Sequence, residues 1–156
     1  MVEWRVRTLL SKEPDTIKWI DSFDKNKKII FWDIGANIGL FSIYSAHKHE
    51  GNIKVIAFEP SSSNLRVLTR NISINNFSDK IFINQIALTN KKNVFLDMNE
   101  PDFIEGSSLN TFGEKFNFEG KNFKARQKYR IFGTTMDAMI EERCLEIPDY
   151  IKIDVD

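Results

Sequence analysis

"IIFWDIGANIGLFSIYSA", residues 29 to 46, passes from a continuous apolar run into a turn with two glycines and then into helical spacing. An unbroken apolar run of this length is typical of a strand that is buried on both faces of a parallel sheet. Gly35 and Gly39 allow a sharp turn and a close approach to the main chain. The stretch therefore predicts a strand, a glycine turn and a helix whose first N–H groups are available to an anionic group.

Three further apolar segments repeat the strand pattern, at residues 53–59, 80–86 and 148–156. The segment from Ser61 to Asn76 has apolar residues at helical spacing, serines as N-cap candidates and a pair of asparagines as a stop. This order of strands and helices predicts an α/β fold with a doubly wound, mainly parallel sheet and right-handed crossovers. Functional residues are then expected just after the carboxyl ends of the strands.

The other segments give shorter elements. An early helix is expected with Pro14 in its first turn. Residues 93–98 and 129–135 alternate like strands, and residues 100–128 between them read as a loop. Thr134 and Asp137 have the spacing of a capping box, which predicts a short helix that starts there.

The composition favours a small partner. The 22 basic residues balance the 22 acidic ones, so no net field draws the chain to nucleic acid or to an anionic membrane. The first fourteen residues mix charges into each apolar run and do not form a signal segment. Cys144 is the single cysteine, which excludes an intrachain disulfide, and we expect it to be buried or half-buried at a helix end. A reducing cytoplasm is the expected compartment.

The ends of the first two strands carry the residues of a nucleoside site. Asp33 can meet an ammonium group while the glycine turn receives a carboxylate, which suits a ligand with an amino acid end. The dinucleotide fingerprint is absent, because Gly35 is followed by Gly39 at the wrong spacing. Glu59 lies 24 positions after Gly35, where a carboxylate can accept both hydroxyls of a ribose, and Pro60 fixes the exit from that strand.

The next two strand ends are less specific. Asn84, Gln85 or Ala87 could border an adenine ring, and the sequence does not choose among them. Asp154 and Asp156 share one face of an extended strand. They could bind a divalent ion, position an acceptor or begin a solvated loop, and because no third ligand is identifiable we predict no metal site.

Two other patterns invite a ligand and are explained by structure alone. His47 and His49 stand two apart, which is the wrong spacing for one helix face, so we expect a water-exposed helix end. Residues 112–130 interleave six basic residues with phenylalanines. Such a run can bind single-stranded nucleic acid or line an acceptor, but phenylalanines that pack a loop on the sheet edge explain it as well.

The chain resembles the FkbM family of S-adenosylmethionine-dependent methyltransferases over nearly its whole length. By this resemblance, the amino acid end of S-adenosyl-L-methionine lies at residues 33–39, the ribose at Glu59 and the adenine near residues 85–87. Ser107 and Ser108 lie in a family-like segment, and their role stays open. The segments that carry the resemblance are SKEPDTIKWIDSF, FWDIGANIGLFSIYSA, VIAFEPSSSNLRVLTRNISINN, INQIALTNKKNVFLDM, GSSLN, TTMDAMI and PDYIKIDVD. The expected cofactor-binding residues are Asp33, Gly35, Ala36, Asn37, Gly39, Glu59, Pro60, Gln85 and Ala87.

The resemblance also implies a reaction. Methyl transfer to a hydroxyl of a small molecule or sugar is expected, with Asp154 as the catalytic residue nearest the acceptor. A nicotinamide oxidoreductase with a divergent fingerprint and a non-catalytic scaffold domain are the alternatives. Retention of the cofactor distinguishes the three.

The resemblance finally implies a Rossmann-like class I methyltransferase fold. Residues 1–28 would form an N-terminal helix and lead-in, and residues 29–156 the cofactor domain. The chain stops at Asp156, inside a motif that continues in the family, so the C-terminal strands of the sheet are expected to be missing. The fourth strand would then be an apolar edge that exposes Ile151, Ile153 and Val155.

Overall fold

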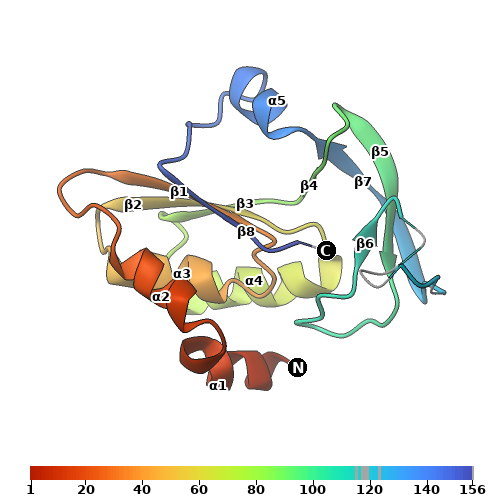
Figure 1. The fold of residues 1–156 in the computed structure, drawn as a ribbon, viewed down its shortest axis with the longest axis horizontal. Helices are drawn as coiled ribbons and strands as arrows, with labels where there is room; N and C mark the ends of the chain where they lie inside the picture. Colours follow the sequence, from red (N-terminus) through yellow and green to blue (C-terminus); the bar gives the residue numbers. More distant parts are fainter. Residues whose placement is uncertain (115, 117–119, 123, 156) are drawn as a thin grey trace.

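The computed structural model describes residues 1–114, 116, 120–122 and 124–155. Figure 1 shows two β-sheets, the first of which has helices on both faces. The first sheet is parallel and has the strand order β3-β2-β1-β8, which confirms the predicted α/β architecture with a parallel sheet. Its strands are β1 (Ile29–Ile34), β2 (Ile53–Phe58), β3 (Ile81–Asn84) and β8 (Tyr150–Ile153).

Side chains alternate between two apolar cores because successive residues of a strand point to opposite faces. In β1, Ile29 and Phe31 belong to one buried cluster, and Trp32 and Ile34 belong to the other. Three helices contribute to the first cluster and one helix to the second, which explains why the strands are mostly apolar on both faces. These helices are α2 (Pro14–Asp21), α3 (Leu40–Lys48) and α4 (Ser62–Ile74) on the first face and α5 (Met136–Glu141) on the second.

The strand register brings three strand ends to one edge. Ile34 at the end of β1 pairs with Phe58 of β2 on one side and with Ile153 of β8 on the other. The residues that follow these strands therefore lie close together, as expected for the carboxyl edge of a parallel sheet.

A second sheet was not predicted. It has the order β4-β7-β5-β6, and β5 pairs antiparallel with both of its neighbours. The expected strands at 93–98 and 129–135 are present. The expected loop at 100–128 is wrong in three places, because residue 100 belongs to β5, residues 111–112 form β6 and residues 127–128 belong to β7. The strands are β4 (Ala87–Leu88), β5 (Val94–Glu100), β6 (Thr111–Phe112) and β7 (Gln127–Thr134).

The caps of two helices test the capping predictions. Ser61 is the N-cap of α4 and its hydroxyl accepts a hydrogen bond from Asn64 N–H, which confirms the first. The cap of α5 is Thr135, so the prediction of Thr134 is wrong. Thr134 is fully buried at the end of β7, where its hydroxyl donates to the Asn93 side chain at 3.0 Å.

The N-terminal helix α1 (Val2–Lys12) is an element that the sequence did not indicate. Three of its large apolar side chains, Trp4, Val6 and Leu10, are exposed, and none of its residues is fully buried. Its apolar pattern is therefore a poor helix signal. Within the described residues, no helix is long and apolar enough to cross a membrane.

Three local expectations about exposure have different outcomes. His47 is exposed as expected, but His49 is buried and its Nε2 lies 2.8 Å from the Ile20 carbonyl oxygen, so the prediction of a water-exposed pair is wrong for His49. Cys144 is exposed, which contradicts the expected burial, because α5 ends before it and the chain turns there with a positive φ of 55°. The apolar edge on β8 is confirmed, with Ile153 62% exposed.

Candidate active site

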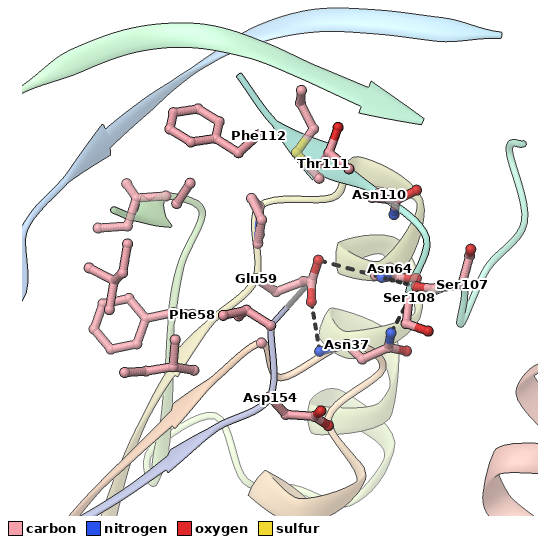
Figure 2. Close-up of a pocket in the computed structure, with 18 of the residues that line it drawn as sticks. Asn37, Phe58, Glu59, Asn64, Ser107, Ser108, Asn110, Thr111, Phe112 and Asp154 are labelled. Atoms are coloured by element: carbon pink, nitrogen blue, oxygen red, sulfur yellow. Dashed lines mark hydrogen bonds between the residues drawn. The ribbon is translucent and has the colours of Figure 1, made fainter. Parts of the chain in front are cut away.

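A cavity of about 650 Å³ opens at the carboxyl edge of the first sheet. Figure 2 shows Glu59 at its centre, Asp154 on one side and the segment from Ser107 to Thr111 on the other. Of the predicted site residues, six line this cavity and four do not. Gly35, Asn37, Glu59, Pro60, Ala87 and Asp154 line it, whereas Asp33, Ala36, Gly39 and Gln85 are absent from its walls.

Glu59 is a buried carboxylate held by backbone donors. Its Oε2 accepts from Asn37 N–H at 2.7 Å, and its Oε1 accepts from Ser61 N–H at 2.9 Å. The side-chain amide of Asn64 lies 3.4 Å from the same Oε1. Burial outweighs these donors and raises the pKa of Glu59 to about 7. Oε2 accepts only one of these hydrogen bonds and has a second lone pair, so the carboxylate can still accept a hydrogen bond from a ligand in the cavity.

The glycine turn has a structural cause within the chain itself. Gly35 and Gly39 have φ values of 78° and 84°, which favour glycine. A Cβ on Gly35 would lie 2.1 Å from the Asp154 carbonyl oxygen, and one on Gly39 would lie 2.3 Å from Leu68 Cδ1. The two glycines are therefore required by the packing of β8 and α4, and only Gly35 also faces the cavity.

Asp33 lies beneath the turn, away from the cavity walls. It is 1% exposed, and its Oδ2 accepts from the Ser42 hydroxyl at 2.6 Å. Its Oδ1 has no hydrogen-bond partner among the described residues. Burial raises the pKa of the Asp33 carboxyl, and the nearby Lys152 ammonium opposes that rise.

Asp154 follows β8 and faces the cavity. Its backbone N–H donates to the Ile34 carbonyl at 3.0 Å, which extends the pairing of β8 with β1. Its carboxylate pairs with Lys152 at 3.0 Å, and the lysine is buried whereas the aspartate side chain is 59% exposed. The predicted partner of Asp154, Asp156, lies outside the described residues. Among those described, no cluster of three or more metal-ligating side chains is found.

An apolar wall closes the cavity next to β4. It consists of Ile86, Ala87 and Leu88, which follow the end of β3. Gln85 is exposed and does not line the cavity. A flat aromatic ring is the kind of ligand group that suits such a surface.

Asn64 is a site residue that the sequence analysis missed. It is 2% exposed, and its side chain donates to the Ser107 carbonyl at 3.0 Å and accepts from Gly106 N–H at 2.8 Å. Asn37 donates to the same Ser107 carbonyl at 2.9 Å. Two asparagines thus fix the segment at residues 106–107 over the glycine turn (Figure 2). The family-like GSSL segment was the available signal, although its contacts depend on tertiary structure.

A buried polar network also ties the second sheet to this site. Glu100 is fully buried, and its Oε1 accepts from the hydroxyls of Ser61 and Tyr129, each at 2.7 Å. The Tyr129 hydroxyl in turn accepts from Ser62 N–H at 2.7 Å, and burial raises the pKa of Tyr129 to about 12. Because Ser61 also holds Glu59, the second sheet helps to fix the central carboxylate.

Two solved structures are similar to parts of this chain. A structure of methyltransferase FkbM from Methylobacillus flagellatus has a TM-score of 0.51 and 19% identity, and covers 86% of this chain and 27% of that one. A precorrin-6y C5,15-methyltransferase from Geobacter metallireducens has a TM-score of 0.40 and 18% identity, with 47% and 36% of the two chains covered. The first of these likenesses shows a shared fold.

Two comparisons by sequence also found matches. The methyltransferase sdnD of Sordaria araneosa is 49% identical over 43 residues, which are 28% of this chain and 16% of that protein. The chain thus spans much less than two thirds of the length of these relatives. The family model described as "Methyltransferase FkbM domain" matches residues 33–156. This chain belongs to the FkbM methyltransferase domain family.

Proposed function

We propose that the protein binds S-adenosyl-L-methionine in this cavity and transfers its methyl group to a hydroxyl of a small molecule or sugar. The buried carboxylate of Glu59, held by two backbone N–H groups at the end of β2, is the observation that supports this most strongly. Carboxylates at this position of an α/β sheet accept the hydroxyls of a ribose.

The cavity fits an adenosyl ligand in size and chemistry. Its volume of about 650 Å³ lies within the range of about 300 to 1,000 Å³ that is usual for small-molecule sites. Glu59 offers acceptors for a ribose, residues 86–88 offer an apolar surface for an adenine, and Gly35 and Asn37 border the remaining end. A polar centre between an apolar wall and a polar turn matches the three parts of this cofactor.

When bound, the cofactor supplies an activated methyl group on a sulfonium, so the protein has to position it and the acceptor and exclude water. Positioning of this kind can lower a barrier by about 7 to 11 kcal/mol. In this proposal, Asp154 accepts the proton that the hydroxyl of the methyl acceptor loses, since its carboxylate is exposed at the cavity wall. Lys152 orients that carboxylate through their 3.0 Å contact.

Asp33 has a supporting role in this proposal. Because it is buried beneath the turn and bonded to Ser42, it holds the start of α3 in place below the turn. Asp33 would therefore act on the ammonium group of the cofactor through its electrostatic field. Its Oδ1, which has no hydrogen-bond partner among the described residues, contributes to that field. The residues that would contact the cofactor directly in the cavity are Gly35, Asn37 and Glu59.

Calorimetry with S-adenosylmethionine, S-adenosylhomocysteine and NAD tests the proposal. We expect binding of the first two ligands and none of NAD, because the turn lacks the dinucleotide spacing. Binding of NAD without binding of S-adenosylhomocysteine would favour an oxidoreductase instead. Failure of all three ligands to bind would favour a non-catalytic domain.

A further inference from the structure

Helix α1 brings two cationic side chains, Arg5 and Lys12, to the wall of the cavity. They are seven positions apart, which is close to two helical turns, so they lie on the same side of the helix. In the part of the chain that the structure describes, neither side chain forms an ion pair with an acidic residue. Lys12 instead lies over the ring of Trp4, with its Nζ 5.4 Å from the ring centroid.

Arg5 is held in place by a backbone contact. Its Nε donates to the Gly106 carbonyl at 2.5 Å. Gly106 has a φ of 81°, and a Cβ there would lie 3.3 Å from Met1 Cγ and 3.5 Å from Arg5 Cδ, so α1 packs directly on this glycine. The terminal nitrogens of the guanidinium have no hydrogen-bond partner among the described residues. These donors remain available to a ligand.

The segment that anchors Arg5 is part of the site. Gly106 N–H donates to the Asn64 side chain at 2.8 Å, and the next carbonyl accepts from both Asn37 and Asn64. Arg5 is therefore fixed, through one segment, at the end of the cavity that the glycine turn borders. Arg5 and Asn37 thus contact neighbouring carbonyls of the same segment, those of Gly106 and Ser107.

The acidic side chains of the cavity do not neutralise these cations. Glu59 is bound by backbone N–H groups and Asp154 by Lys152. Glu114 is exposed and, among the residues that the structure describes, forms no ion pair with α1. Arg5 is half-buried and has no acidic partner among the described residues, so an anionic ligand group would supply the partner that the chain does not.

We propose that Arg5 and Lys12 form a binding site for a carboxylate or another oxyanion of the molecule that occupies this cavity. The proposal rests on the proposed function, because it assigns a ligand group to the same cavity. Two sources share the required chemistry. One is the α-carboxylate of the cofactor, and the other is an acidic group on the methyl acceptor.

Calorimetry with two adenosyl ligands distinguishes these sources. S-adenosylhomocysteine has the carboxylate, whereas 5′-methylthioadenosine lacks the whole amino acid end. If the cofactor supplies the anion, Arg5→Gln weakens binding of S-adenosylhomocysteine by roughly tenfold or more and leaves methylthioadenosine unchanged. Lys12→Gln should also weaken binding of S-adenosylhomocysteine, and it does not disturb the contact of Arg5 with Gly106. It therefore tests the site even if Arg5→Gln displaces helix α1.

If the acceptor supplies the anion, the arginine variant leaves both adenosyl ligands unchanged. The protein is then loaded with S-adenosylhomocysteine and titrated with malonate or with inorganic phosphate, and the NMR signal of the Arg5 Nε–H is followed. We expect these anions to bind to the parent protein and not to Lys12→Gln. The control is Arg7→Gln, on the same helix, because Arg7 pairs with Glu3 at 2.6 Å and does not line the cavity.

The outcomes separate this proposal from the proposed function. If the parent protein binds neither adenosyl ligand, the proposed function fails, and anion titration of the free protein still tests the cation site. If both adenosyl ligands bind, no variant alters their ratio and neither anion binds at Arg5, the cation site is refuted while the proposed function stands.

Discussion

Replacing Glu59 by glutamine tests how the site holds a carboxylate. The substitution keeps the size of the side chain and removes its charge. In the folded protein, burial raises the pKa of Glu59 from 4.5 to about 7. The folded state therefore binds a proton more tightly than the unfolded state, and the contribution of Glu59 to stability is fully present below pH 4.5 and is lost as the pH rises to about 7.

The magnitude follows from the two pKa values. Integrating the linkage relation between pH 5 and pH 8 gives a loss of about 2.5 kcal/mol in the free energy of unfolding that is due to this one group. Glutamine does not titrate, so the variant lacks this loss. The difference in stability between the parent protein and Glu59→Gln should therefore shift by about 2 to 3 kcal/mol in favour of the variant between these pH values.

Urea denaturation of both proteins at pH 5, 6, 7 and 8 measures this difference. Glu141→Gln is the control for the loss of a carboxyl group, since Glu141 is exposed at the end of α5. Parallel pH profiles for the parent protein and Glu59→Gln would refute the reasoning, because they would mean that the carboxyl is ionised equally easily in both states.

The same carboxylate gives a prediction for binding. A ribose donates hydrogen bonds to the ionised form, so affinity for S-adenosylhomocysteine should increase as the pH rises through about 7. Glu59→Ala should weaken binding by about 1 to 3 kcal/mol, because the hydroxyls lose their partner. An unchanged dissociation constant in calorimetry would remove Glu59 from the site.

Three other substitutions have distinct expected outcomes. Gly35→Ala should lower the free energy of unfolding by about 2 kcal/mol or more, because its Cβ would lie 2.1 Å from a backbone oxygen. The control is Gly51→Ala, which reports the strain in φ alone because nothing lies within 4 Å of its Cβ. Equal losses of stability in thermal denaturation of the two variants would contradict the packing argument. Tyr129→Phe should cost about 1 to 3 kcal/mol because it removes one donor from buried Glu100, and an unchanged urea midpoint would show that the network contributes nothing. Asp154→Asn should leave the affinity for S-adenosylhomocysteine unchanged and lower kcat by roughly 100-fold with any hydroxyl acceptor that is found, so a full kcat would exclude Asp154 as the proton acceptor.

The first sheet could be predicted because its signals are local. The strands β1, β2 and β8 are apolar except for one charged residue each, and helical spacing follows both β1 and β2. Parallel strands with short connections then bring their carboxyl ends together, which places Glu59 and Asp154 at one edge before any side-chain contact is known.

The second sheet could not be predicted in the same way. The strands β5 and β7 alternate and were expected, but β4 and β6 have just two residues each. Such a strand forms because its partner is present, so its signal is not in its own sequence. The role of Glu100 depends on this pairing, since β5 and β7 bring Glu100 and Tyr129 to the start of α4.

The glycine turn shows how a correct pattern can have more than one cause. The sequence predicts that something approaches the main chain between Gly35 and Gly39. In the structure, the Asp154 carbonyl fills the space beside the first glycine and the Leu68 side chain fills the space beside the second. A glycine indicates a close approach, but it does not say whether the approaching group belongs to a ligand or to the chain.

A crystal structure of the protein with S-adenosylhomocysteine tests the central claim most directly. The account predicts density for the ligand in the cavity at the carboxyl edge, with the ribose hydroxyls within hydrogen-bond distance of Glu59 and the amino acid end next to Gly35 and Asn37. Density for the ligand at another place, with the space beside Glu59 filled by water alone, would contradict it.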